Sequence, residues 1–315
     1  MNDALHVPVL LERVMDLLTP SVVGDRPVIV DGTLGLGGHT EAMLVRFPDL
    51  HVIGIDRDPE ALARAKERLA GFGDRVTYAH AVYDEITDVV RGAGFETISG
   101  VLFELGVSSM QLDLAERGFA YAQDAPLDMR MNPEDELTAA DILNTYEASD
   151  LAKVLRYYGE EKFAKRIADA VVAARGDEPF TNSARLVDLI RTSIPAAARR
   201  TGGNPAKRTF QALRIEVNDE LGAYRRALPA ALEVLAPGGR IVVLAYHSLE
   251  DRITKHEFAR STKTDVPRDL PFVPEGHEPK FKLITRGAEM ATEAEIEDNS
   301  RARSVRLRVI ERIAA

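Results

Sequence analysis

A glycine-rich turn between an apolar segment and a helix-like segment constrains the fold of this chain more than any other feature. The apolar residues 28–30 end in Asp31, and the turn that follows contains Gly35, Gly37 and Gly38. Glycines let backbone amides approach a ligand closely, and the next helix adds its positive dipole end. A second apolar run, residues 51–55, ends in Asp56, where an acid can bind ribose hydroxyls. The segment therefore predicts a site for a nucleoside cofactor.

The turn matches the dinucleotide fingerprint G-x-G-x-x-G only in its first half. Gly35 and Gly37 fit the pattern, but Thr40 occupies the sixth position. This departure weakens the pyrophosphate interpretation. A looser glycine turn suits a ligand without phosphates, such as S-adenosylmethionine. Taken alone, the turn supports a purely structural strand–helix connection about as well as it supports a ligand site.

Strand-like and helix-like segments alternate through the first hundred residues and predict βαβ units with a parallel sheet. The expected strands are residues 28–31, 51–56, 76–78, 100–104, 240–245 and 305–309. Helices are expected at 40–46, after the Asp58-Pro59 cap, throughout 138–192 and at 210–232, with a turn at 237–239. We therefore expect an α/β sheet domain from residues 1–111 and 207–315. A helical, substrate-binding insert is expected to occupy residues 112–206.

Composition excludes several kinds of site. The chain has 315 residues, enough for one large α/β domain and a smaller one, and it contains no cysteine. Disulfides, thiolate metal sites and cysteine nucleophiles are therefore excluded. The seven histidines show no metal-ligand spacing, so we expect no bound metal. No signal-like N-terminus and no apolar run of membrane length are present, so we expect a cytoplasmic protein without a membrane partner.

The charge distribution favours a polyanionic partner although the net charge is −10. The window 189–215 contains six basic residues and no acid. Such local patches bind phosphate backbones regardless of the total charge. We predict that phosphate groups of a nucleic acid contact this window at Arg199, Arg200, Lys207 and Arg208. The alternative is a solvated basic face without a ligand.

Polar motifs follow the expected strands at the edge where such sheets bind ligands. Glu104 is followed by a stretch that contains Ser108, and His247 follows the strand 240–245 together with Ser248. A helix cap explains Ser108 better than catalysis does when the motif is taken alone. A hydrolase triad is disfavoured for His247 because no Gly-x-Ser-x-Gly elbow is present. A structural or substrate-binding role suits this histidine better.

Taken together, the motifs resemble the RsmH (MraW) family from residue 6 to about residue 308. They are Asp31-Gly32-Thr33 through Gly37-Gly38-His39, Asp56-Arg57-Asp58-Pro59, Leu105-Gly106-Val107-Ser108-Ser109, Ala115-Glu116-Arg117-Gly118-Phe119, Pro126-Leu127-Asp128-Met129-Arg130-Met131, Tyr158-Gly159-Glu160-Glu161, Arg208-Thr209-Phe210-Gln211-Ala212 and His247-Ser248-Leu249-Glu250-Asp251-Arg252. Members of this family are S-adenosylmethionine-dependent methyltransferases that act on N4 of a cytidine in the decoding region of bacterial small-subunit (16S) ribosomal RNA. The resemblance implies a class I (Rossmann-like) methyltransferase sheet with a helical inserted domain. It also implies a 30S particle as partner.

The resemblance further implies the residues of the site. It places cofactor contacts at Gly37, Gly38, His39, Asp56, Tyr83, Glu104 and Gln111. For catalysis we predict His247 and Ser108. Two positions depart from the family pattern: Glu104 stands where the family usually has Asp, and Tyr246 where it more often has Phe. The first departure puts the geometry around Glu104 in doubt.

Residue chemistry favours direct attack by the cytosine amine. Methylation of carbon five requires a cysteine nucleophile, which the chain lacks. The group that polarises the amine cannot be identified from the sequence. Two other functions remain open: an NAD-dependent oxidoreductase that uses the same glycine turn, and a non-catalytic ribosome-assembly factor with a relic pocket. A homodimer is also left open.

Overall fold

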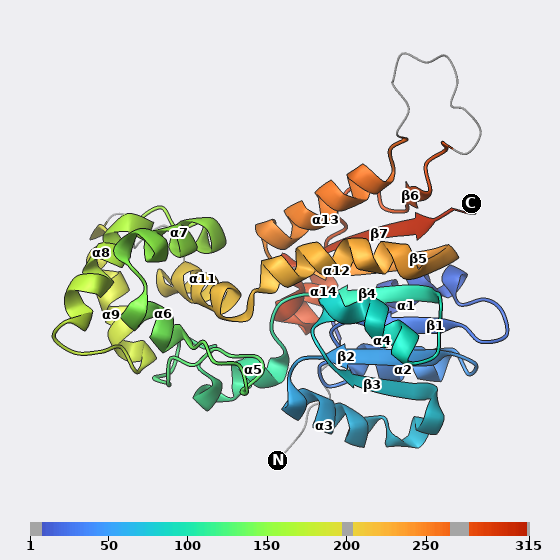
Figure 1. Ribbon diagram of the computed structural model, residues 1–315, viewed down its shortest axis with the longest axis horizontal. Coiled ribbons are helices and arrows are strands. Elements are labelled where there is room, and N and C mark those ends of the chain that lie inside the picture. The colour runs from blue at the N-terminus through green and yellow to red at the C-terminus, as the bar shows by residue number, and fades with distance from the viewer. Residues whose placement is uncertain (1–7, 197–203, 265–276, 314–315) are drawn as a thin grey trace, which may run out of the picture. The chain divides into compact units, whose positions relative to one another are not determined.

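The computed structural model describes residues 8–196, 204–264 and 277–313 (Figure 1). Its contacts divide the chain into two compact units. The sheet unit runs to Gly106 and resumes at Gly222, whereas the insert unit spans Val107–Leu221. The insert expected at 112–206 lies inside this second range. The insert unit extends further because the helix that follows residue 205 packs on other helices of the insert.

Among the described residues, seven strands form one sheet in the order β3-β2-β1-β4-β5-β7-β6. Their bounds are β1 Val28–Asp31, β2 His51–Asp56, β3 Val76–His80, β4 Ile98–Glu104, β5 Leu235–Ala245, β6 Phe281–Leu283 and β7 Arg306–Arg312. β1 to β5 pair in parallel, and β7 lies antiparallel to both β5 and β6. This is the Rossmann-like order that the resemblance implies, and the predicted fold class is confirmed. β6 was not expected, and the turn expected at 237–239 lies inside β5, near a shift in register.

Helices cover both faces of this sheet (Figure 1). Their bounds are α1 Leu11–Leu18, α2 Gly38–Arg46, α3 Pro59–Arg68, α4 Ile86–Gly92, α12 Glu220–Val234, α13 Ser248–Ser261 and α14 Glu293–Asp298, with short 3-10 turns η1 Thr19–Ser21, η2 Ala70–Arg75, η3 Tyr83–Glu85 and η5 Ser300–Ser304. Alternate strand residues point to opposite faces. Ile29 therefore packs with α1 and α2, and Val30 packs with α4 and α12. The expected cap of α3 is confirmed, because the Asp58 side chain accepts from the backbone amide of Glu60 at 3.1 Å.

The insert unit is helical and has a core of its own. Its elements are α5 Ser109–Asp113, η4 Ala115–Arg117, α6 Ala139–Thr145, α7 Ala148–Gly159, α8 Ala164–Arg175, α9 Ser183–Ser193 and α11 Ala206–Asn218. The helical character expected over 138–192 is confirmed. The single helix expected at 210–232 is wrong: α11 ends at Asn218, and Asp219 adopts φ 45° before α12 begins. No helix in the described part of the chain has the length and apolar character needed to cross a membrane.

Candidate cofactor site and residues predicted to contact RNA

The glycine turn after β1 joins this strand to α2. Gly37 precedes α2 with φ 76°, a left-handed conformation that most side chains disfavour. A Cβ atom on Gly38 would lie 2.8 Å from Cγ of Pro8. The turn therefore needs glycine at these positions both for its conformation and for close packing.

Asp56 ends β2 and is fixed by two backbone amides. Its Oδ2 accepts from Gly35 N at 2.7 Å, and its Oδ1 accepts from Asp58 N at 2.9 Å. Burial raises the pKa of Asp56 to about 6, although both hydrogen bonds act to lower it. The carboxylate is therefore mostly ionised at neutral pH. Each of its oxygens keeps acceptor capacity for a further donor such as a ribose hydroxyl.

Asp31 ends β1, and its carboxylate is almost fully buried. Its Oδ2 accepts from the hydroxyl of Thr40 at 2.7 Å, and its Oδ1 accepts from Thr33 N at 3.3 Å. Burial raises the pKa of Asp31, and the hydrogen bond from Thr40 opposes this rise. Thr40 therefore has a structural reason to occupy the position at which the dinucleotide fingerprint has glycine.

Glu104 ends β4 and joins two other side chains. Its Oε2 lies 3.2 Å from Nδ1 of His39, and its Oε1 accepts from the hydroxyl of Tyr246 at 2.7 Å. The other ring nitrogen of His39 lies 3.1 Å from the carbonyl oxygen of Val9. Both nitrogens thus face acceptors, an arrangement that suits the doubly protonated ring.

The charge states of His39 and Glu104 depend on each other. Burial lowers the pKa of His39, but the charges of Glu104 and Asp31 outweigh it and hold that pKa above the usual value. Burial raises the pKa of Glu104, but His39 and Tyr246 outweigh it and hold that pKa below the usual value. The geometry at Glu104, which the sequence left in doubt, is thus that of an ion pair supported by a tyrosine hydroxyl.

Three carboxylates therefore stand at the ends of adjacent strands: Asp31, Asp56 and Glu104. His39 pairs with Glu104, and the charge of Arg301 also acts to lower the pKa of that carboxyl. This charge balance favours ligand groups that are cationic or rich in hydroxyls and disfavours a pyrophosphate. Among the described residues, no group of three or more His, Asp and Glu side chains is arranged to hold a metal ion.

Tyr83, another predicted cofactor contact, lies in η3 just after β3. Its ring packs edge-on against Phe103 of β4, with centroids 5.8 Å apart, and against Tyr224 of α12 at 6.5 Å. Aromatic packing across three elements therefore fixes the ring next to the ends of the strands.

His247 lies directly before α13, and its Nε2 is 3.0 Å from Oε1 of Glu250. Glu250, which the sequence did not single out, is buried and accepts from the backbone amides of Tyr246 and His247 at 2.7 and 3.2 Å. Asp251 instead binds Arg306 at 3.0 Å and Arg308 at 2.7 Å. Asp251 is therefore paired with two arginines and not with His247. This agrees with the expectation that these residues form no hydrolase triad.

Ser108 and Gln111 belong to the insert unit and form a reciprocal helix cap. The Ser108 hydroxyl accepts from Gln111 N at 3.2 Å, and the Gln111 side-chain oxygen accepts from Ser108 N at 3.1 Å. This is the capping role that the sequence favoured for Ser108 alone. Its catalytic role and the cofactor contact of Gln111 remain predictions.

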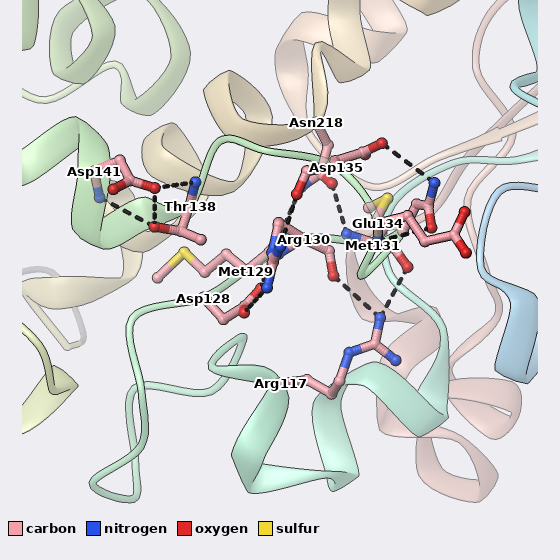
Figure 2. Close-up of polar contacts among 11 residues, drawn as sticks. Arg117, Asp128, Met129, Arg130, Met131, Glu134, Asp135, Thr138, Asp141 and Asn218 are labelled. Carbon is pink, nitrogen blue, oxygen red and sulfur yellow. Dashed lines mark hydrogen bonds and ion pairs between the residues drawn. The ribbon is translucent and has the colours of Figure 1, made fainter.

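The loop that contains Asp128 and Arg130 is held at several points (Figure 2). Arg130 forms a two-pronged ion pair with Asp128, at 2.7 and 2.9 Å. The Arg117 guanidinium donates to the carbonyl oxygens of Arg130 and Met131 (Figure 2). Asn218 of α11, which the sequence did not single out, accepts from Met131 N at 2.7 Å. These bonds hold the loop in a conformation in which the backbone at Met129 has φ 62°.

The structure describes two of the four residues predicted to contact RNA. Lys207 and Arg208 are exposed in the first turn of α11. Arg199 and Arg200 lie outside the described residues.

Comparisons with known proteins agree with this arrangement. A family model described as "MraW methylase family" matches residues 3–313. "Ribosomal RNA small subunit methyltransferase H" of Nocardioides sp. is 63% identical over 99% of this chain and 98% of its own length. The protein of the same name from Streptomyces avermitilis is 59% identical, again over 99% of this chain and 98% of its own length.

The similarity of this chain to solved structures is weak. The crystal structure of an rRNA methylase from Streptococcus thermophilus aligns with 98% of this chain and 99% of its own, at 12% identity and a TM-score of 0.44. That likeness is too weak to support a conclusion. The match to the family model over nearly the whole sequence, and relatives close to 60% identical, establish that this chain belongs to the MraW methylase family.

Proposed function

We propose that this protein is a ribosomal RNA methyltransferase that transfers a methyl group from S-adenosylmethionine to N4 of a cytidine in the decoding region of the small-subunit RNA. The observation that carries the proposal is the full-length match to the MraW methylase family, together with relatives named for small-subunit ribosomal RNA methylation. An oxidoreductase does not agree with this family membership.

The ends of the strands support S-adenosylmethionine as the cofactor. The molecule contains a ribose diol, an ammonium group and a sulfonium, and it has no phosphate. Asp56 is oriented by two backbone amides and can accept from the ribose hydroxyls. Asp31 and Glu104 add negative charge, which favours the cationic groups. When bound, S-adenosylmethionine supplies an electrophilic methyl group to a nucleophile.

The protein's own contribution to the reaction is positioning. The exocyclic amine of cytosine is a weak nucleophile because its lone pair is delocalised into the ring. Alignment of two reactants can lower a barrier by about 7–11 kcal/mol in favourable cases. The target base must also leave its stack to be modified. We assign His247, together with Ser248, to positioning the displaced base, and no covalent adduct is needed.

A methylation assay with ribosomal particles tests the proposal. Purified protein, labelled S-adenosylmethionine and small-subunit particles from a strain without this protein are incubated. The RNA is digested to nucleosides to identify the methylated base, and to oligonucleotides to locate it, both by mass spectrometry. We expect N4-methylcytidine at one site in the decoding region. Methyl on carbon five, or on another base, would contradict the proposal. If the protein binds the particle but incorporates no methyl group, the result would support a non-catalytic assembly factor with a relic pocket. A titration followed by nicotinamide fluorescence would detect the NAD binding that an oxidoreductase requires. The homodimer and the cytoplasmic location remain predictions.

A further inference from the structure

One aromatic ring stands free on the surface of the insert unit. The side chain of Tyr157, near the end of α7, is 66% exposed. Every other tyrosine, and every phenylalanine, in the described part of the chain is at least half buried. An isolated exposed apolar residue is ordinary by itself. Its surroundings therefore decide whether the ring has a ligand.

The packing of α7 explains why Tyr157 is exposed. α7 lies beside α11 in the insert unit (Figure 1). Gly159 contacts the backbone of α11 so closely that a Cβ atom there would lie 2.5 Å from the carbonyl oxygen of Arg208. Gln211 of α11 donates to the carbonyl oxygen of Tyr158 at 2.9 Å. The last turn of α7 is thus fixed against the first turns of α11, with the Tyr157 ring exposed nearby.

The cations at this junction lack acidic partners. Arg156, Lys207 and Arg208 are exposed, and none of them forms an ion pair with another described residue. By contrast, Lys153 of α7 pairs with Asp150, and Lys165 of α8 pairs with Asp169, both at 2.7 Å. The acid closest in sequence, Glu160, has an interaction partner of its own. Exposed positive charge and the exposed ring therefore lie on the same two packed helix ends, the last turn of α7 and the first turn of α11.

We propose that Tyr157, Arg156, Lys207 and Arg208 form a binding surface for single-stranded RNA, in which the Tyr157 ring stacks on an unpaired base. The inference rests on the proposed function and extends it. Unpaired bases stack on aromatic rings whatever their sequence, and neighbouring cations bind the phosphates. A base inside a duplex already has stacking partners, so the surface discriminates between single-stranded and paired RNA.

The absence of tryptophan allows a direct test of stacking. The wild-type chain contains none, so Tyr157→Trp introduces a single indole. We expect its fluorescence to be quenched by an unpaired oligoribonucleotide but not by a duplex of the same sequence. Val45→Trp, at a position on α2 that is 69% exposed, is the matched control and should show no quenching. Equal quenching of both variants, or quenching by the duplex, would overturn the proposal.

Affinity separates this inference from the proposed function. Tyr157→Ala should weaken binding of unpaired RNA by about 5- to 150-fold, whereas Tyr157→Phe, which keeps a stacking ring, should bind as the wild type does. KM for the particle should rise in the alanine variant, with kcat at saturation little changed. Unchanged affinity in a folded alanine variant that still methylates RNA would overturn only the stacking surface. If the wild-type protein methylates no RNA, the proposed function fails, and the fluorescence result stands separately. A response to ribosomal protein but not to RNA would overturn the inference in favour of a protein partner.

Discussion

The hydroxyl of Tyr246 donates a 2.7 Å hydrogen bond to Oε1 of Glu104, across 142 positions of sequence. The other carboxylate oxygen lies 3.2 Å from Nδ1 of His39. The two departures from the family pattern are therefore in contact. The additional methylene of Glu104 and the additional hydroxyl of Tyr246 accommodate each other.

This contact predicts that substitutions at the two positions are coupled. Glu104→Asp should retain activity, because it restores the residue usual in the family. It should also lower the free energy of unfolding by about 1–3 kcal/mol, because the shorter carboxylate leaves the Tyr246 hydroxyl unpaired. Adding Tyr246→Phe should recover most of that loss. Urea unfolding of the two single variants and the double variant measures the coupling, which we expect to be about 0.5–3 kcal/mol.

Additive effects of the two substitutions would contradict this coupling. If the Glu104→Asp variant folds but is inactive, the local backbone depends on the longer side chain of Glu104.

The pair of His39 and Glu104 predicts how stability depends on pH. The pKa of His39 is raised in the folded protein, so its contribution is complete below about pH 6.5 and is lost as the pH rises through the folded value. The pKa of Glu104 is lowered, so its contribution is present above about pH 4.5 and is lost as the pH falls through the folded value. The stability difference between wild type and His39→Gln should therefore be largest between about pH 4.5 and 6.5. Chemical unfolding from pH 4 to pH 9 measures it, and a difference that does not change with pH would reject the ion pair.

Asp56 is predicted to bind the ribose of the cofactor. Asp56→Ala should weaken S-adenosylmethionine binding by about 1.5–3 kcal/mol, the loss expected for hydrogen bonds to a charged group. Wild-type affinity should also fall as the pH drops through about 6, because protonation removes acceptor capacity. Titration calorimetry measures both effects. Asp49→Ala, which removes an exposed acid just before β2, is the control and should bind normally. Normal affinity in the Asp56 variant would show that this strand end does not hold the ribose.

Lys207 and Arg208 are predicted to contact phosphates. Neutralising both should reduce the slope of log affinity for RNA against log salt concentration by about 0.7–0.9 for each lost contact. The matched control is neutralisation of Lys153 and Lys165, which are also exposed but are already paired with acids. Salt titrations of RNA binding measure the slopes. If the two double variants have the same slope, the basic window is only a solvated face.

His247 is predicted to position the base and not to act as a nucleophile. His247→Ala should lower methyl transfer while leaving cofactor affinity within about 0.5 kcal/mol of the wild type. Calorimetry and single-turnover methylation separate these quantities, and thermal unfolding checks that the variant remains folded. A covalent RNA adduct trapped with any variant would overturn the direct-attack mechanism.

The sequence by itself determined the elements that depend on neighbouring residues. All strands of the sheet except β6 follow from short apolar or alternating runs. The start of α3 follows from Asp58 and Pro59. The left-handed Gly37 follows from the glycine turn. These signals are local, because periodicity, capping and backbone freedom act within a few residues of the chain.

Only the tertiary structure decided which distant side chains meet. Asp219 interrupts what the apolar pattern predicted as one helix, because α11 packs in the insert while α12 covers the sheet. The contact of Tyr246 with Glu104 joins β4 to the residue after β5. The exposure of Tyr157 depends on how the end of α7 packs on α11. Each outcome depends on the geometry with which whole elements pack, and this geometry arises from many contacts between residues far apart in the chain.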